Sequence, residues 1–292
     1  MAETGSVTVS IAISMALSAP IAHISIKKGY LTKDGVLASL LVAVAAAFTG
    51  LRSFIYIFAF FISSSMLTYI GYKTKQTRGS AEKSGGRTWR QVFGAGGVGS
   101  LLFVLSFIAH YLGFYEWAKY SLLTALVVFA ASTADTWAAE IGSLSKKEPR
   151  LVVKPWVKVC PGTSGGVTML GELASISGAA FMGFVAVILT SLVNFIHYGT
   201  WSALTLSPHI TFAFITSLGW LGEFLDSIVG ATLQAKYYCP ECGTLTDKEV
   251  HICGSLTQFH SGFKFIGNES TNVIATSILA LVSLALAYSL NL

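Results

Sequence analysis

The chain has 292 residues, of which 53% are hydrophobic and only 11% are charged. Soluble domains have about 25% charged residues, so this composition excludes an ordinary water-soluble fold. The net charge of +5 indicates membrane topology and not nucleic-acid binding, because bases in the loops of a membrane protein mark the side on which those loops lie. We therefore expect an integral membrane protein that binds no nucleic acid.

Apolar runs recur along the chain, and a helix needs about 20 apolar residues to cross a bilayer. They predict an all-α, polytopic helical bundle with about eight transmembrane helices, in a range of about six to nine. The predicted segments are residues 7–25, 36–48, 53–72, 91–115, 117–134, 167–196, 210–233 and 271–290. A signal peptide is the alternative for the first, but it lacks the basic residues that precede one. The second is short, so the count depends on its being separate from the third.

Lysine and arginine are distributed unevenly among the loops. All but two of the 19, Arg52 and Lys119, fall in the loops that follow the first, third, fifth and seventh segments. Eight alternating spans put these four loops on one side, and the positive-inside rule makes that side the cytosol or the equivalent stromal or matrix face. Both termini then lie on the opposite side.

We expect a single integral membrane domain over residues 1–292, with a polar, cytosolic insertion at residues 235–266 that contains three of the 4 cysteines. The sequence leaves open which membrane is involved, whether the cell membrane, the endoplasmic reticulum or a plastid membrane. It also leaves open the oligomeric state.

Acidic residues stand at the ends of several apolar segments. The fifth segment runs on into Asp135 and Glu140, which end it, and Asp226 lies near the end of the seventh. A charge inside a membrane span costs about 2.5 kcal/mol or more, so such residues usually face a cavity, an ion or a partner. The topology gathers these acids at the basic face, where carboxylates together with substrate phosphates could hold Mg²⁺. The alternative is structural pairing with lysines and arginines of the loops.

Two polar stretches are candidates for binding phosphate. Residues 161–168 form a Gly-, Ser- and Thr-rich turn before the sixth segment, where backbone N–H groups and the helix dipole favour an anion. The turn lacks the Gly-Lys-Ser/Thr of a Walker A motif, and a simple helix cap is the alternative. Arg87, Arg90 and Gln91 could hold phosphate by paired hydrogen bonds, or could belong to an ordinary topology-setting loop.

The most specific local pattern is a Cys-x2-Cys pair, Cys239 and Cys242, followed by His251 and Cys253. These four soft ligands have the spacing of a structural Zn²⁺ site. Free thiols or a disulfide are the alternatives, and a cytosolic face disfavours the disulfide. Cys160 has no histidine near it in sequence, and we expect it to be a bystander.

Several strings of residues, in this order, carry a family resemblance: 87–93 (RTWRQVF), 134–142 (ADTWAAEIG), 161–168 (PGTSGGVT) and 226–234 (DSIVGATLQ). They resemble the transmembrane protein 19 family (domain of unknown function 92), and the resemblance covers most of the chain from about Lys33 onward. Part of that family also has a Cys-rich insertion after the last string. This chain differs at Ala95, where the family often has Asn, and in the middle of residues 268–272.

The plant member of that family is the phytyl-phosphate kinase of tocopherol synthesis. The resemblance therefore implies transfer of a phosphoryl group from CTP or ATP to a prenyl monophosphate, with Mg²⁺ as cofactor. It implies that Asp135, Glu140 and Asp226 bind Mg²⁺ or nucleotide phosphates. The early loop and the family strings together predict these substrate- and phosphate-binding residues: Arg87, Arg90, Gln91, Thr136, Thr163, Ser164, Gly165, Gly166, Thr168, Ser227, Gln234, Asn268 and Asn272.

Two functions follow from the sequence. The first is a membrane prenyl-phosphate kinase that converts phytyl, geranylgeranyl or farnesyl monophosphate to the diphosphate. The alternative is a transporter or flippase for an anionic substrate, with intramembrane acids coupling it to ions. Acids at one membrane face favour the enzyme, whereas acids near the midplane favour transport. A structural scaffold ranks third, because it has no use for an acid cluster.

Overall fold

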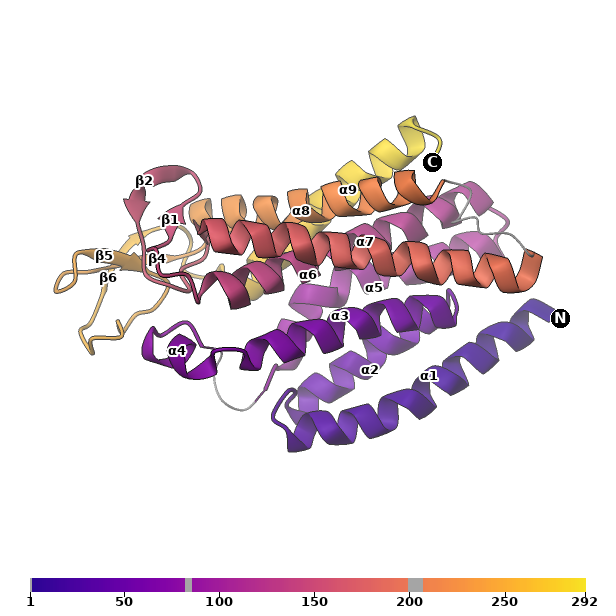
Figure 1. The fold of residues 1–292 in the computed structure, drawn as a ribbon, viewed down its shortest axis with the longest axis horizontal. Coiled ribbons are helices and arrows are strands. Elements are labelled where there is room, and N and C mark those ends of the chain that lie inside the picture. The colour runs from indigo at the N-terminus through magenta and orange to yellow at the C-terminus, as the bar shows by residue number, and fades with distance from the viewer. Residues whose placement is uncertain (1, 82–85, 199–206) are drawn as a thin grey trace.

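The computed structural model describes residues 2–81, 86–198 and 207–292. Long helices form a bundle, and short strands gather at one end of it (Figure 1). The described helices are α1 (Ala2–Lys27), α2 (Lys33–Ala47), α3 (Leu51–Tyr69), α4 (Tyr72–Thr77), α5 (Trp89–Tyr111), α6 (Tyr115–Gly142), α7 (Met169–Tyr198), α8 (Pro208–Thr232) and α9 (Asn268–Ser289).

Seven of the described helices are long and apolar enough to cross a membrane, and α2 falls short of that length. Its 15 residues extend about 22 Å at about 1.5 Å per residue, against a hydrocarbon core of about 30 Å. Each predicted segment nevertheless corresponds to one helix, and α4 is a short extra helix in the polar loop after α3. The prediction of a polytopic, helical membrane protein is confirmed.

The fifth predicted segment, which runs on from residue 134 into the acid pair, corresponds to α6, and this helix continues to Gly142. Ala138 and Ala139 are strong helix formers, and the buried side chain of Glu140 finds partners that keep it in the last turns. Asp135 and Glu140 therefore both lie within the last turns of the helix.

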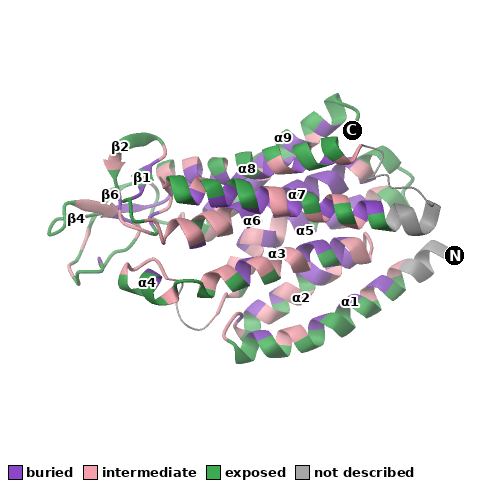
Figure 2. Ribbon diagram, in the orientation of Figure 1, coloured by how far each residue is buried: buried purple, intermediate pink, exposed green. Residues whose placement is uncertain are grey.

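The core is centred on α6, which packs against α3, α5, α7, α8 and α9. Its residues from Tyr120 to Ala134 are all buried, so this part of the helix is covered by neighbours around its whole circumference (Figure 2). Small residues let α8 approach it closely. A Cβ at Gly222 would come within 2.5 Å of the Ala131 side chain, so this glycine is a position of close helix packing.

Two small antiparallel sheets cover the end of the bundle at which α6 and α8 end and α7 and α9 begin (Figure 1). Their strand orders are β2-β1-β3 and β5-β4-β6, and the second sheet lies in the predicted insertion. A bridge between Val159 and Leu245 joins the two. The strands are β1 (Arg150–Leu151), β2 (Lys154–Lys158), β3 (Gly166–Val167), β4 (Lys236–Cys239), β5 (Thr244–Thr246) and β6 (Gln258–Ser261).

Both ends of the chain lie at the end of the bundle opposite the sheets (Figure 1). The long helices alternate in direction, so the loops after α1, α3, α6 and α8 gather at the sheet end. This is the arrangement that the distribution of Lys and Arg predicts, although residues 82–85 of the second such loop lie outside the described ranges. The side of the membrane that this end faces stays a prediction.

Candidate functional site

A polar cavity of about 430 Å³ lies at the sheet end, between the ends of the helices and the turn at residues 161–168. It collects side chains from α5, α6, α8 and α9, which are far apart in sequence. Of the residues predicted to act on phosphate or Mg²⁺, these line it: Arg87, Gln91, Asp135, Thr136, Glu140, Thr163, Ser164, Gly165, Gly166, Thr168, Asp226, Ser227, Gln234, Asn268 and Asn272.

Arg90 belongs to the predicted set but does not line the cavity. Its guanidinium lies exposed over the Trp89 ring, 5.5 Å from the ring centroid. Gln91 does line it, and its Oε1 also accepts a hydrogen bond from Thr88 N at 2.9 Å in the capping box that begins α5. The helix start thus directs Arg87 and Gln91 to the cavity and Arg90 away from it.

Asp135 on α6 and Asp226 on α8 form the acidic part of the cavity. Asp135 accepts no hydrogen bond from the described residues, and Arg87 is the basic residue whose charge acts on it. Asp226 is buried, and Asn272 donates its amide N–H to Asp226 Oδ1 at 3.0 Å. The charges of Asp135 and Asp226 also act on each other. A pair of mutually repelling carboxylates with so few donors is suited to a cation.

Glu223 is a third acid of this region, and its environment is different. It is buried on α8, where its two carboxylate oxygens accept hydrogen bonds from Ser175 Oγ at 3.1 Å and Ser227 Oγ at 3.0 Å. The hydroxyl of Ser227, which the sequence predicts to bind phosphate, is therefore directed to Glu223.

Glu140 has partners on both of its carboxylate oxygens. Oε2 forms an ion pair with the fully buried Nζ of Lys75 on α4, and Oε1 accepts from Thr68 Oγ1 on α3 at 2.8 Å. Lys75 Nζ also donates to the Leu67 carbonyl oxygen at 2.8 Å. For Glu140 this is the alternative predicted from the sequence, namely structural pairing of an acid with a lysine of a loop. With these contacts, Glu140 ties α3, α4 and α6 together, and we do not include it among the ligands proposed below.

The turn at residues 161–168 lies against the last turns of α8. Gly165 has a φ of +74°, and a Cβ there would come within 2.6 Å of the Ser227 carbonyl oxygen and 2.5 Å of the Ala231 side chain. The left-handed backbone and the contact with α8 both require glycine at this position. The sequence predicts that this glycine allows approach to phosphate, and the structure gives it a packing role.

Several polar groups of this turn already have partners within the protein. Thr163 N donates to the Cys160 carbonyl oxygen at 3.1 Å, and Ser164 N donates to Asp247 Oδ2 at 2.7 Å. Thr168 Oγ1 accepts from a backbone N–H at the start of α7 and so caps that helix. A phosphate in the cavity would meet the side chains of the turn and not these two N–H groups.

Asp247 also lines this cavity, and no sequence pattern indicates it. Besides Ser164 N, it accepts hydrogen bonds from Gln234 Nε2 at 3.1 Å and from the buried Lys236 Nζ at 2.6 Å. Burial raises the pKa of Asp247 and lowers that of Lys236. The sequence around Asp247 follows no recognisable motif, so only the folded hairpin reveals that it joins the insertion to the turn.

The predicted zinc ligands come together in the insertion. One ligand atom from each of Cys239, Cys242, His251 and Cys253 lies within 4.8 Å of the other three, and all four cysteines of the chain are free thiols. His251 Nδ1 lies 3.1 Å from Cys253 Sγ. Within the cluster, hydrogen bonds that come first from Ser255 lower the pKa of Cys253 to about 6, and hydrogen bonds with Cys253 and Cys239 raise the pKa of Cys242 to about 12. The cluster is therefore capable of holding a metal ion.

Cys160 is not the bystander that the sequence analysis predicts. Its Sγ lies 3.1 Å from His251 Nε2, the ring nitrogen that faces away from the cluster. Cys160 N also donates to the Leu245 carbonyl oxygen at 3.1 Å. Cys160 thus connects the cluster to the turn that borders the polar cavity, a contact between residues about 90 positions apart that no local pattern indicates.

These features define a multi-pass integral membrane protein with a polar, acidic cavity at one end of its helical bundle. The chain belongs to the family described as "Integral membrane protein DUF92", whose sequence profile matches residues 16–280. No solved structure matches it.

Relatives from plants and archaea are similar over long stretches. Protein PGR of Arabidopsis thaliana is 29% identical over 290 residues, which cover 93% of this chain and 94% of that protein. The uncharacterized membrane protein MJ0933 of Methanocaldococcus jannaschii is 26% identical over 231 residues, covering 79% and 83%. Protein VTE6, chloroplastic, of Arabidopsis thaliana is 26% identical over 238 residues, covering 80% of this chain and 58% of that protein.

Proposed function

We propose that this protein is a membrane prenyl-phosphate kinase, which transfers a phosphoryl group from CTP or ATP to phytyl, geranylgeranyl or farnesyl monophosphate. One observation carries the proposal. A single cavity gathers the carboxylates of Asp135 and Asp226, the guanidinium of Arg87 and a set of hydroxyl and amide side chains from separate helices and one turn. The family resemblance of the strings that supply these residues supports the same reaction.

The position of the acids along their helices favours an enzyme over a transporter. Asp135 and Asp226 both lie about two helical turns from the sheet end of α6 and α8. Asn268 begins α9 at the same end. A site at this depth is accessible to a soluble nucleotide from one side and to a lipid phosphate from the membrane, whereas ion coupling in a transporter is expected near the midplane.

The donor set fits Mg²⁺. The cavity offers oxygen ligands, and Mg²⁺ is usually bound by one or two carboxylates together with substrate phosphates. Gln234 Oε1, a buried carbonyl oxygen of the lining, has no hydrogen-bond partner among the described residues. We assign Asp135 and Asp226 as the residues that would hold Mg²⁺, which when bound would neutralise charge on the phosphate oxygens.

The residues of the chain would orient two phosphate groups for in-line transfer. Arg87 would bind the lipid monophosphate through its guanidinium, and Asn268 and Asn272 would contact the nucleotide phosphates. An oxygen of the lipid monophosphate attacks the terminal phosphorus of the nucleotide. The bond from that phosphorus to the bridging oxygen breaks, and the nucleoside diphosphate leaves. The attacking oxygen is already ionised, so the site needs no general base.

The test is a transfer assay with the full chain purified in detergent. It uses labelled CTP or ATP, each of the three prenyl monophosphates, and Mg²⁺ or a chelator. We expect labelled lipid diphosphate from the wild type with Mg²⁺, and none with the chelator or from Asp226→Asn. If folded wild type forms no product with any pair of substrates, the kinase proposal is wrong and transport becomes the better hypothesis.

We further propose that Cys239, Cys242, His251 and Cys253 hold a structural Zn²⁺. Three thiolates and one imidazole are a common structural zinc set. His251 would bind through Nδ1 and donate its Nε2–H to Cys160 Sγ, as ligand histidines usually donate their second N–H to a neighbouring acceptor. The ion would then stabilise the insertion and, through Cys160, the turn beside the cavity.

Elemental analysis of the purified protein tests this site. We expect about one zinc per chain in the wild type and in Cys160→Ser, which removes no ligand, and little zinc in Cys242→Ser. The melting temperature of Cys242→Ser should fall by several degrees, because metal binding contributes to folding free energy. Wild-type protein that contains no zinc, and whose melting temperature does not respond to added Zn²⁺, would contradict the assignment.

A further inference from the structure

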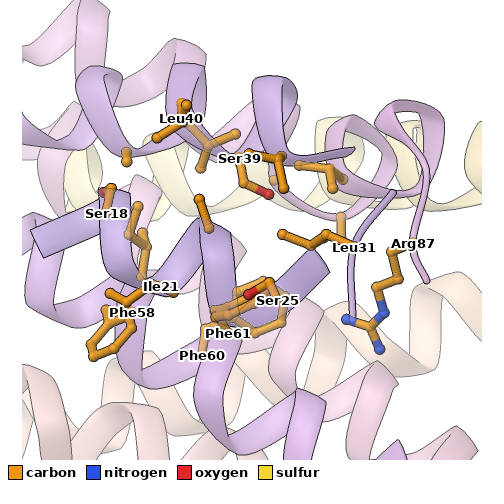
Figure 3. A pocket seen from close by; sticks show the side chains of 18 of the residues that line it. Ser18, Ile21, Ser25, Leu31, Ser39, Leu40, Phe58, Phe60, Phe61 and Arg87 are labelled. Atoms are coloured by element: carbon orange, nitrogen blue, oxygen red, sulfur yellow. The ribbon is translucent and has the colours of Figure 1, made fainter. Parts of the chain in front are cut away.

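A second cavity, of about 110 Å³, lies between α1, α2, α3 and the start of α5, and its lining is mainly apolar (Figure 3). Three helices each contribute residues spaced i, i+3, i+4 and i+7. This spacing places them on one face over two turns, so the cavity follows each helix for about 10 Å. On α3 these residues are Phe54, Ile57, Phe58 and Phe61.

The apolar cavity and the polar cavity are neighbours. Arg87, Gln91 and Ala95 line both of them. Figure 3 places Arg87 beside Leu31 at one end of the apolar cavity, with Ser18 and Phe58 toward the other end. The two cavities therefore share a border at Arg87 and Gln91, from which the apolar cavity extends along the phenylalanines of α3.

We propose that the apolar cavity binds the isoprenoid chain of a lipid monophosphate whose phosphate lies at Arg87 in the polar cavity. The inference rests on the proposed function and adds the place where the substrate's chain is held. A cavity of this size takes the first isoprene units of one chain and not the two chains of a phospholipid. Burial of that chain against the α3 phenylalanines stabilises the complex, since removal of apolar surface from contact with water or head groups is favourable.

Ser39 offers a way to block the cavity without touching its polar neighbour. It lies on α2, and Figure 3 shows its hydroxyl directed to the space between α1 and α3. Ser39→Phe would fill this space. The matched control is Leu37→Phe on the same helix, because Leu37 is 63% exposed and does not line the cavity.

The experiment measures binding of labelled geranylgeranyl monophosphate and of dimethylallyl monophosphate, which has a single isoprene unit, to the purified full chain without nucleotide. Ser39→Phe should weaken geranylgeranyl monophosphate binding about tenfold and change dimethylallyl monophosphate binding little. Leu37→Phe should bind both as the wild type does. Retained binding of the short ligand shows that the Ser39→Phe protein is folded.

The results separate this inference from the kinase proposal. If Ser39→Phe binds geranylgeranyl monophosphate as tightly as the wild type, or if the wild type binds neither lipid, the inference is wrong. If diphosphate is formed but Ser39→Phe leaves the KM for the long lipid unchanged, the kinase proposal stands and the inference fails. If binding depends on Ser39 but no phosphoryl group is transferred, the inference stands as a lipid-phosphate site and the kinase proposal fails.

Discussion

Two acids five positions apart on α6 have opposite environments. Glu140 is enclosed by Lys75 and Thr68, with both carboxylate oxygens bound. Asp135 faces the polar cavity, accepts no hydrogen bond from the described residues and lies near a second carboxylate, that of Asp226. The charge of Glu140 is compensated within the fold by Lys75. The charge of Asp135 is compensated much less, by Arg87.

This difference shows how to distinguish a buried carboxylate that binds a ligand from one that only stabilises the fold. Burial alone does not, because Glu140 is also buried. A carboxylate whose partners are supplied by neighbouring helices contributes to assembly of the bundle, and removal of one partner leaves an uncompensated charge. A carboxylate that faces open space beside another carboxylate is stable only with a bound cation, a proton or a substrate group.

The largest expected effect separates the two acids by activity. Asp135→Asn should lower the rate of phosphoryl transfer by about 10³-fold, because it removes a proposed ligand of the Mg²⁺ that would neutralise charge on the transferring phosphoryl group. Its melting temperature should change little. Glu140→Gln should instead lower the melting temperature of the protein in detergent, while the folded fraction still turns over substrate. Equal loss of turnover in the two folded variants would contradict the distinction between the sites.

A smaller effect is expected at the enclosed pair. Lys75→Met should destabilise the protein by about 3 kcal/mol, because it leaves Glu140 buried without its countercharge. The double variant Lys75→Met/Glu140→Gln should recover part of this loss, as thermal unfolding in detergent can show. The control is Glu116→Gln, which removes an exposed ion pair with Lys119 and should cost no more than about 1 kcal/mol. Additive effects at Lys75 and Glu140 would argue against a coupled pair.

The smallest effect distinguishes two arginines of one loop. Arg87→Gln should raise the KM for the lipid monophosphate about tenfold, since Arg87 lines the cavity and a hydrogen bond to a charged group is lost. Arg90→Gln should change the KM less than about twofold, because its guanidinium lies on Trp89 outside the cavity. Steady-state assays across lipid concentrations measure both. A larger change for Arg90→Gln would mean that the substrate contacts the exposed face.

The sequence predicts the helices well because bilayer-spanning runs are long and their composition is unambiguous. It also predicts most of the cavity lining, since acids and Gly/Ser/Thr turns at the ends of apolar runs meet when antiparallel helices alternate. The sequence also places Asp135 and Glu140 at the end of the fifth span, and both lie in the last turns of α6.

The contacts that depend on tertiary structure are absent from the sequence pattern. Lys75 lies in a polar loop whose bases all suggest topology, and nothing local marks it as the partner of Glu140. Asp247 and Cys160 are similar cases, because each acquires its partner only when two hairpins fold against the same helix end. Tertiary packing brings the Asp247 carboxylate and the Cys160 thiol to their partners, so the local sequence around each residue cannot indicate these contacts.

The hydrogen bond from Ser164 N to Asp247 has a consequence for how this protein can diverge. The Cys-rich insertion supplies the acceptor that orients one wall of the polar cavity, so the insertion cannot be deleted as an independent appendage. A relative that lacks it must supply another acceptor for the same backbone N–H, from a side chain of the turn or from ordered water. The length of the loop after α8 and the residues at 161–168 should therefore change together in evolution.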